Sequence, residues 1–173
     1  MPDPLIDLAR KAVGYYLENK EKLPVSEVMP EVFKKRAGVF VSLYSQNNIL
    51  RGCIGTYLPY KKNLAEEIIA NAISAAFRDS RFEPLRKNEL ENLKISVDVL
   101  SKPEPIKKIS ELDPKKYGVV VKSADGKSGL LLPDLEGINT PQTQIAIACQ
   151  KASISTENDA IFLYRFTVDR HKE

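Results

Sequence analysis

Five adjacent residues combine a permanent cation, a thiol and two glycines: Arg51-Gly52-Cys53-Ile54-Gly55. If residues 49–57 form a strand, side chains alternate between its faces, so Arg51 and Cys53 share a face with Cα atoms ~6.6 Å apart. Glycine in a strand marks a bulge or the close approach of a backbone or a ligand. An arginine fork holds carboxylate or phosphate well, and a nearby cation lowers the pKa of a thiol. The pattern predicts a site for a small anionic ligand, or a nucleophilic thiol at Cys53.

A structural role for the same side chains stays open. A lone cysteine on a strand is usually a small buried hydrophobe, and Arg51 could be the ion-pair partner of a carboxylate that supports the fold. His171 is the single histidine and could serve Cys53 as a base, although a residue so near the end is more often in solvent. Cys149 lies on the apolar face of an expected helix, so we interpret it as structural. The exposure of the Cys53 sulfur and the Arg51 head group decides between these interpretations.

A second group of cations follows directly after an apolar helical stretch. Segment 77–86 combines three arginines with two aromatic residues, namely Phe77, Arg78, Arg81, Phe82 and Arg86. Such a group could pair and stack with an anion or a nucleotide. The alternative is an ion-pair network in which Asp79 fixes the loop while Phe82 and Leu85 fill the core.

Composition limits the classes of protein to consider. The 173 residues, 43% apolar and 28% charged, fit one globular domain that carries a small subdomain. A net charge of +3 is weaker than the bias typical of a nucleic-acid-binding domain, so nucleic acid is a disfavoured partner that stays open. No apolar run is long enough to cross a membrane, and two distant cysteines make no disulfide framework, so we expect a cytoplasmic protein. Scarce histidine predicts no metal site, and Gly126-Lys127-Ser128 lacks the spacing of a phosphate loop, so no cofactor is expected.

Hydrophobic periodicity indicates the elements that position these residues. Helices are expected at four places: 3–19, 63–79, 87–92 and 140–152. Strands are expected at six: 39–44, 49–57, 94–100, 117–121, 129–132 and 161–168. The first two strands form a hairpin, and the third keeps one face in water. Short turns and single helices join the strands without regular βαβ alternation, so the predicted class is α+β, with an antiparallel sheet flanked by helices.

Four blocks of the sequence resemble the AMMECR domain family, named from the human AMME-syndrome chromosomal region. They are Leu50-Arg51-Gly52-Cys53-Ile54-Gly55-Thr56, residues 75–85 (AAFRDSRFEPL), residues 129–137 (GLLLPDLEG) with the following Gln144 and Lys151-Ala152, and residues 163–168 (LYRFTV). The blocks occur in the family's order, and the resemblance runs from about residue 5 to the end. Ser80 and Ser153 depart from it, because the family commonly has proline and glycine there.

The resemblance implies a fold and a site. Residues 1–173 are expected to form a single AMMECR domain, with a larger part at about 1–105 plus 155–173 and a smaller inserted α/β part at about 106–154. Binding residues are expected at six positions: Arg51, Gly52, Gly55, Asp79, Arg81 and Phe82. Cys53 is the candidate catalytic residue.

The resemblance also implies partners. Bacterial and archaeal relatives look like the A component of a three-part system with a radical-SAM protein and a MEMO-like protein, the latter similar to non-haem-iron dioxygenases. This chain carries neither a radical-SAM cysteine triad nor an iron-binding histidine set. An accessory or substrate-handling component is therefore expected, whose partners supply the chemistry. The resemblance names no established activity and does not decide whether the chain is an enzyme.

Overall fold

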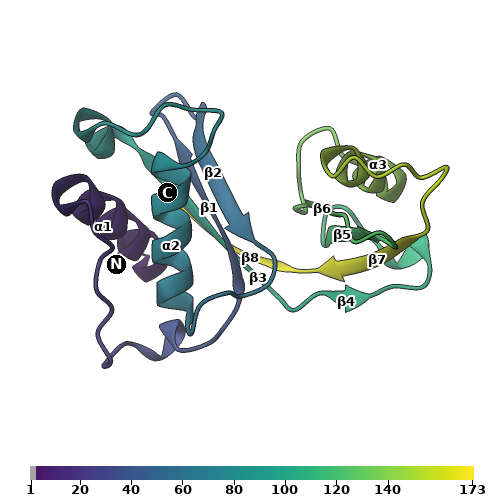
Figure 1. Cartoon of the computed structure of the whole chain (residues 1–173), viewed down its shortest axis with the longest axis horizontal. Helices are drawn as coiled ribbons and strands as arrows, with labels where there is room; N and C mark the ends of the chain where they lie inside the picture. Colours follow the sequence, from purple (N-terminus) through teal and green to yellow (C-terminus); the bar gives the residue numbers. More distant parts are fainter. Residues whose placement is uncertain (1–2) are drawn as a thin grey trace. The chain divides into compact units, whose positions relative to one another are not determined.

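The structure is a computed structural model that describes residues 3–173 (Figure 1). They form two compact units, each with its own sheet and its own apolar core. Unit 1 extends to Val99 and takes in Asp169–Glu173, whereas unit 2 is Leu100–Val168. Both units combine helices with antiparallel strand pairs, so the predicted α+β class is confirmed.

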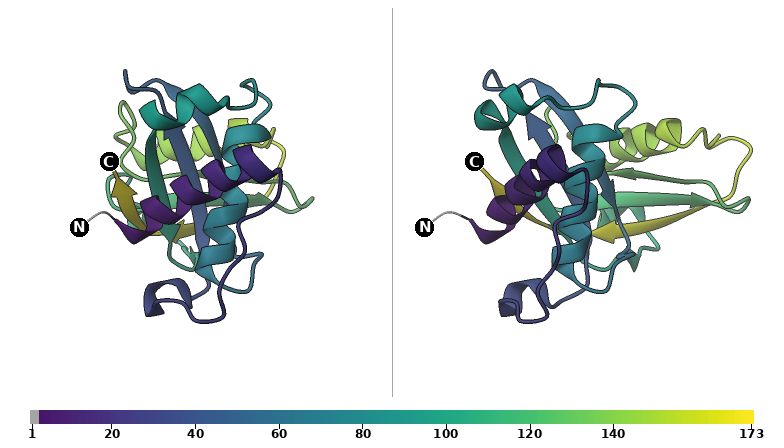
Figure 2. Two further views of the ribbon diagram at one scale, coloured as in Figure 1. Left: turned by 90° about the vertical axis from the view of Figure 1, so that its left-hand side faces the viewer. Right: turned by 60° about the vertical axis from the view of Figure 1, so that its left-hand side comes forward.

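Unit 1 is a sheet with two helices on one of its faces (Figures 1 and 2). The helices are α1 (Pro4–Asn19) and α2 (Leu64–Phe77), and 3-10 turns occur at η1 (Glu31–Phe33) and η2 (Lys87–Asn92). The strands are β1 (Gly38–Tyr44), β2 (Leu50–Thr56), β3 (Lys94–Leu100) and β8 (Val168–Lys172). Their order across the sheet is β2-β1-β3-β8, so β2 is an end strand.

Side-chain caps start both helices of unit 1. The Asp3 carboxylate accepts a hydrogen bond from the Leu5 N–H at 2.9 Å, and the Asn63 side chain accepts one from the Glu66 N–H at 2.9 Å. The apolar stripes of the helices then pack on the sheet in one core, which includes Val13, Val39, Val41, Leu43, Ile68 and Ile73. The expected helices at 3–19 and 63–79 are therefore confirmed.

Strands β1 and β2 form the expected hairpin, and β2 contains a bulge. Leu43 pairs with Gly52, but Tyr44 pairs with Leu50, so Arg51 is an extra residue between two paired ones. Such a bulge bends its strand and redirects the extra side chain. Strict alternation along β2 therefore does not apply at Arg51.

Gly52 brings β2 into backbone contact with α2. A Cβ atom at this position would lie 2.1 Å from the carbonyl oxygen of Ala75. The glycine is therefore needed for a helix to approach this strand closely. Because successive side chains alternate, the Cys53 side chain lies on the sheet face opposite to α2.

Strand β3 is buried on both faces, which corrects the expectation of a wet face at residues 94–100. Ser96 is 9% exposed and Asp98 is 4% exposed. The Asp98 carboxylate accepts a hydrogen bond from Arg170 Nε at 2.9 Å, so β8 supplies the cation that compensates its burial. The expectation was wrong because alternation of polar and apolar residues does not reveal a distant partner such as Arg170, which makes burial of the Asp98 carboxylate possible.

Unit 2 is a second antiparallel sheet, covered by α3 (Pro141–Lys151). Its strands are β4 (Glu104–Pro105), β5 (Gly118–Ser123), β6 (Ser128–Leu131) and β7 (Ile161–Phe166), in the order β4-β7-β5-β6, and η3 (Ile109–Glu111) is a 3-10 turn. A glycine again brings strand and helix together, since a Cβ at Gly129 would lie 1.9 Å from the Ala148 carbonyl oxygen. Each unit thus has a strand glycine beneath a helix alanine.

The units divide the chain at residues that differ from the expected boundaries. The expected smaller part is about 106–154, whereas unit 2 begins at Leu100 and ends at Val168. Strand β7 accounts for the later end, because it pairs with β5 from Ser123↔Ile161 to Gly118↔Phe166. The expectation assigned this strand to the larger part, because its sequence does not reveal its pairing partner.

Candidate functional site

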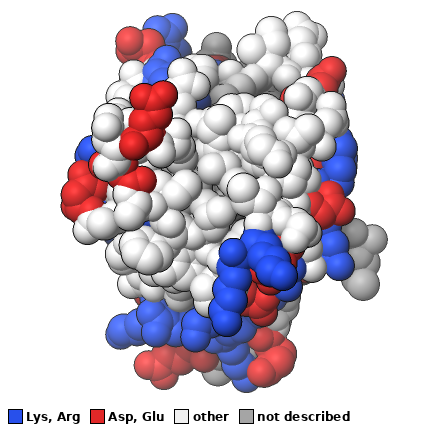
Figure 3. Space-filling view, turned by 90° about the vertical axis from the view of Figure 1, so that its right-hand side faces the viewer, with Lys and Arg blue, Asp and Glu red and all other residues white. Residues whose placement is uncertain are grey.

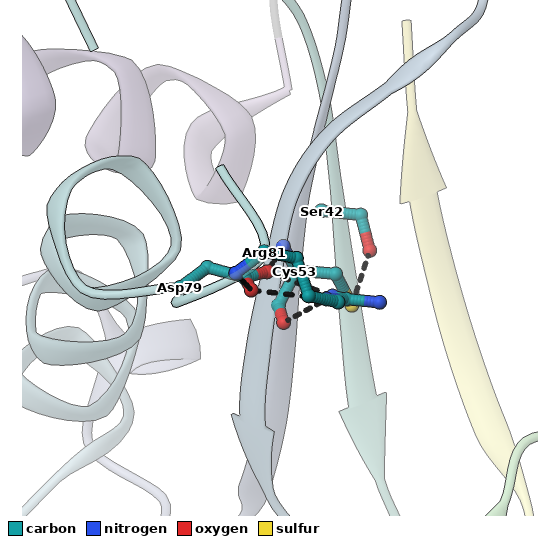
Figure 4. A network of polar contacts seen from close by, with 4 residues as sticks. All are labelled: Ser42, Cys53, Asp79 and Arg81. Atoms are coloured by element: carbon teal, nitrogen blue, oxygen red, sulfur yellow. Dashed lines mark hydrogen bonds and ion pairs between the residues drawn. The ribbon is translucent and has the colours of Figure 1, made fainter. Parts of the chain in front are cut away.

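Cys53, Asp79 and Arg81 form one hydrogen-bonded group (Figure 4). The Cys53 N–H donates to Asp79 Oδ2 at 2.9 Å. Arg81 Nε and Nη2 donate to the two oxygens of this carboxylate at 3.0 and 2.7 Å, and Nη2 also donates to the Cys53 carbonyl at 3.4 Å. Both backbone polar groups of Cys53 therefore point away from β1, toward the loop that follows α2. The structure brings together these three of the predicted site residues.

Asp79 fixes the geometry of this group. Its side chain is only 4% exposed, and its carboxylate also accepts the Arg81 backbone N–H at 3.2 Å. Hydrogen bonds from the Arg81 side chain hold the pKa of Asp79 well below its ordinary value, although burial acts in the opposite direction. The carboxylate is thus ionised at neutral pH. This arrangement is the ion-pair network considered as the structural alternative for segment 77–86.

Arg81 is a held cation that still faces solvent. Its side chain is 56% exposed, while its inner edge is bound by Asp79. The guanidinium carbon lies 5.3 Å from the centroid of the Phe82 ring, within the range of a cation–π contact. Two side chains therefore hold one planar guanidinium in place beside Cys53, and its outer edge is free to meet a ligand.

Cys53 is a free cysteine of intermediate exposure. The Ser42 hydroxyl, opposite it on β1, donates a hydrogen bond to Cys53 Sγ at 3.2 Å. Desolvation raises the pKa of the Cys53 thiol above its ordinary value, although this hydrogen bond and the positive charge of Arg81 act to lower it. The thiol is therefore protonated at neutral pH, and it can contact or donate to a ligand more readily than it can attack one.

Arg51 belongs to a different group from the thiol. Arg51 Nε and Nη2 donate to the two oxygens of Glu89 at 2.8 and 3.2 Å, and the Arg51 side chain is 19% exposed. This hydrogen-bonded ion pair is what lowers the pKa of Glu89. The bulge directs Arg51 toward η2, and the cation that acts on the Cys53 thiol is Arg81. The expectation that Arg51 and Cys53 share one chemical patch is thus replaced by two neighbouring ion-pair groups.

The two glycines of the segment are explained by packing. Gly52 lies under the Ala75 carbonyl of α2. A Cβ at Gly55 would lie 2.3 Å from Cγ of Phe40 and 2.5 Å from the Val39 carbonyl oxygen. Close neighbours therefore occupy the space at both glycines, which shape the strand that carries Cys53.

The remaining candidates are elsewhere. His171 Nδ1 lies 2.6 Å from Asp3 Oδ2, and its Nε2 lies 3.3 Å from Asp169 Oδ2, so the imidazole is used beside the start of α1 and is no base for Cys53. Cys149 is 2% exposed in the core of unit 2, as expected for a structural cysteine. Among residues 3–173, no group of three or more His, Cys, Asp or Glu side chains is placed to hold a metal ion.

Sequence reasoning missed two members of these groups. Ser42 follows from the predicted hairpin once its register is known, because it pairs directly with Cys53. Glu89 lies in η2, far from Arg51 in sequence, and its side chain also accepts the Arg86 N–H at 2.8 Å. Acidic residues are common in such turns, so no local signal singles out this one. In the described part of the chain, no helix is long and apolar enough to span a membrane.

Two antiparallel α+β units, with a buried aspartate that joins an Arg-Gly-Cys-Ile-Gly strand to an exposed arginine, define the class of this protein. A solved structure of an uncharacterised protein from Pyrococcus horikoshii has the same fold, with a TM-score of 0.88 at 31% identity, over 98% of this chain and 89% of that one. The AMMECR1 family model matches residues 6–171, and the chain belongs to this family.

Two relatives differ in how much of their length this chain covers. A protein from Thermotoga maritima is 49% identical over 170 residues, which cover 98% of this chain and 97% of the relative. A protein from Clostridium acetobutylicum is 48% identical over 174 residues, which cover 99% of this chain but 36% of the relative. The chain thus spans about a third of the longer protein.

Proposed function

We propose that this chain is an accessory, substrate-handling component that binds an anionic group, or a modified residue on a partner protein, at Cys53 and Arg81. The observation that carries the proposal is the Arg81 guanidinium, which is 56% exposed although buried Asp79 holds its inner edge beside the thiol. A cation fixed before binding loses little conformational freedom when a ligand arrives. Its planar fork suits carboxylate or phosphate.

The partners that we propose are MEMO-like and radical-SAM proteins, as the family resemblance suggests. The Clostridium acetobutylicum relative supports a role within a larger assembly, because this chain corresponds to only 36% of its length and the family module is there one part of a longer polypeptide. In this proposal the partners carry the redox chemistry, and this chain presents or receives the group on which they act.

A thiol enzyme with Cys53 as nucleophile is less well supported. Burial raises the pKa of the Cys53 thiol, which lowers its thiolate fraction at neutral pH. The single histidine of the sequence is paired with Asp3 and Asp169. The thiol thus lacks both of the usual means of activation, a lowered pKa and an adjacent base.

Nucleic-acid binding is also less well supported. The arginines of segment 77–86 do not form one continuous basic surface, because Arg81 is bound to Asp79. Figure 3 shows one face of the molecule with a broad uncharged area and with both basic and acidic side chains along its margins. Binding to RNA or DNA that weakens steeply with salt would support this alternative.

Pull-down with purified MEMO-like and radical-SAM proteins from the same organism tests the proposal. We expect wild-type chain to retain at least one of them, and Arg81→Gln to weaken retention about tenfold through loss of a charge-assisted contact. Arg86→Gln is the matched control, because it removes an exposed arginine from the same loop. Retention of no partner by the wild type, or equal retention by the two variants, would contradict the proposal.

A further inference from the structure

A separate cavity of about 230 Å³ lies beside α2 in unit 1. Three cationic residues line it: Lys22, Lys61 and Arg78. Neither Cys53 nor Arg81 is among its lining residues, so it is distinct from the site proposed above. Arg78 belongs to the 77–86 arginine group and takes no part in the Asp79 network.

The cavity wall follows from a polar stripe on an otherwise apolar helix. Positions 67, 71, 74 and 78 of the α2 region lie on one face by helical spacing, and all four line the cavity. Asn71 is buried and donates to the Val39 carbonyl at 3.1 Å. Ser74 and Arg78, nearer the end of the helix, make no side-chain hydrogen bond or ion pair with the rest of residues 3–173. Positions 67 and 71 of this stripe thus stabilise the fold. The side chains of Ser74 and Arg78 keep donors that a ligand could use.

One acidic residue, Glu67, lines this cavity, and its single charge offsets only part of the three positive charges. Glu67 is 2% exposed, and its carboxylate accepts hydrogen bonds from the Thr56 hydroxyl and from the Tyr60 and Lys61 N–H groups at 2.7–2.9 Å. These neutral donors satisfy its oxygens and fix the loop that carries Lys61. Within the described chain, no ion pair uses the head groups of Lys22, Lys61 or Arg78. Three cationic residues therefore line one cavity with a single carboxylate in its wall, an excess of positive charge that a bound anion would relieve.

Charge and volume indicate the class of ligand. A phosphate monoester carries about −1.5 to −2 at pH 7, which matches the excess positive charge of the wall better than a single carboxylate does. The cavity is too small for a dinucleotide. A second cavity of about 310 Å³ shares Lys22, Lys61 and Ala70 with the first. It adds apolar Leu23, Val25 and Ile69 and one acidic residue, Glu66, whose carboxylate accepts a hydrogen bond from the Asn63 side chain at 3.3 Å. The pair can accept a phosphate group joined to a small apolar body.

We propose that Lys22, Lys61 and Arg78 form a binding site for a small phosphate ester, with the phosphate beside Ser74 and the organic part toward Leu23 and Val25. The site goes beyond the proposed function and does not depend on it. Such a site would bind either an effector or a phosphorylated substrate. Both roles require the same recognition of the phosphate group.

Titration of the whole chain with phenyl phosphate at constant ionic strength tests the site, by calorimetry and by the amide NMR shifts of Ser74 and Arg78. We expect saturable binding that is about tenfold weaker in Arg78→Gln and in Lys61→Gln, since each loses one charge-assisted contact. Lys62→Gln is the matched control, because this exposed neighbour does not line the cavity. Arg81→Gln should bind as the wild type does, which separates this site from the one at Cys53.

Several results would overturn the proposal. Absence of saturable binding to the wild type would do so, as would equal weakening by Lys62→Gln, which would indicate unspecific attraction to the surface. Benzoate binding as tightly as phenyl phosphate would remove the assignment to phosphate. If Arg78→Gln proves unstable by thermal unfolding, Lys61→Gln decides, and unchanged affinity in that variant would contradict the role of the cations.

Discussion

Asp79 is the single residue on which the geometry of the candidate site depends, because its carboxylate joins Cys53 to Arg81. Asparagine has the same shape, but it removes the charge and replaces one acceptor by a donor. We expect Asp79→Asn to lower the free energy of unfolding by at least about 2 kcal/mol. Urea unfolding at pH 7 measures the change. Asp134→Asn, at a side chain that is 65% exposed, is the control, and an equal loss in the two variants would contradict the role given to Asp79.

The same carboxylate determines part of the response to acid. The pKa of Asp79 is lower in the folded chain than its ordinary value of about 3.9, so its contribution to stability is complete above that value. The contribution is lost as the pH falls through the folded-state value. Wild-type stability should therefore fall more steeply below about pH 4 than that of Asp79→Asn. Parallel curves for the two proteins would show that the pair with Arg81 is not responsible.

The Cys53 thiol gives a second prediction at this scale. Because burial raises its pKa, alkylation of Cys53 by iodoacetamide should rise with pH around a midpoint above the ordinary value of ~8.5. Arg81→Gln should move the midpoint higher, since the charge of Arg81 lowers the pKa. Mass spectrometry of the labelled peptide follows the reaction, and buried Cys149 should stay unlabelled in the folded chain. A midpoint near neutral pH would instead favour the nucleophile hypothesis.

Part of the site could be predicted from the sequence. The glycines of the Arg51–Gly55 segment indicated a bulge or a close backbone approach in β2, and the charges of segment 77–86 indicated the Asp79 network. Arg51 could not be placed, because the bulge that turns it to Glu89 depends on the register with β1. The cavity lined by Lys22, Lys61 and Arg78 could not be predicted either. Lys22 lies in an irregular connection, and the residues of α2 that complete the cavity are distant from it in sequence.

Among the elements, the contact between β2 and α2 depends on Gly52. We expect Gly52→Ala to lower the free energy of unfolding by about 3 kcal/mol, because its Cβ would overlap the Ala75 carbonyl and force the helix away. Gly14→Ala is the control in the same unit. In α1 a new Cβ meets only a flexible Leu90 methyl group at 3.3 Å, and the change should be neutral or slightly stabilising. Thermal unfolding compares the two, and a well-tolerated Gly52→Ala would show that the strand and helix can separate without cost.

The elements that could be predicted have strong local signals. Hydrophobic periodicity identified α1 and α2, and two apolar runs close together in the sequence identified the β1–β2 hairpin. Strand β4 has only two residues, and β8 carries mostly charged ones, so neither has the alternation of a strand. Strands β4 and β8 form by pairing with strands that are distant in sequence. No local sequence pattern indicates such pairing.

At the scale of the whole molecule, the first helix and the last strand are joined within unit 1. His171 of β8 contacts Asp3, which caps α1, and Arg10 forms an ion pair with Glu173 at 2.8 Å. Burial alone would lower the pKa of His171, but its hydrogen bond and charge interaction with Asp3 raise it overall. The charged imidazole therefore stabilises the folded chain below the unfolded value of about 6.5, and this contribution is lost as the pH rises through the higher folded value.

This linkage predicts a mild alkaline loss of stability. The free energy of unfolding of the wild type should fall by up to about 1 kcal/mol as the pH rises above about 6.5, a modest amount because the pair is partly exposed to solvent. His171→Gln should lack this change and should match the wild type at high pH. Urea unfolding over this pH range at fixed ionic strength gives the comparison. A slope of the same size in the variant would assign the effect to other groups.

The hydrogen bonds at Cys53 also affect self-association of the chain through the edge of its sheet. An end strand with free N–H and C=O groups is a template on which a foreign strand can add, and proteins commonly block such edges. Asp79 and Arg81 occupy both outward groups of Cys53, in the middle of β2. The Asp79–Arg81 pair, which fixes the guanidinium at the candidate site, thus also blocks strand addition at this edge. A variant that loses it is open to self-association as well as to loss of recognition.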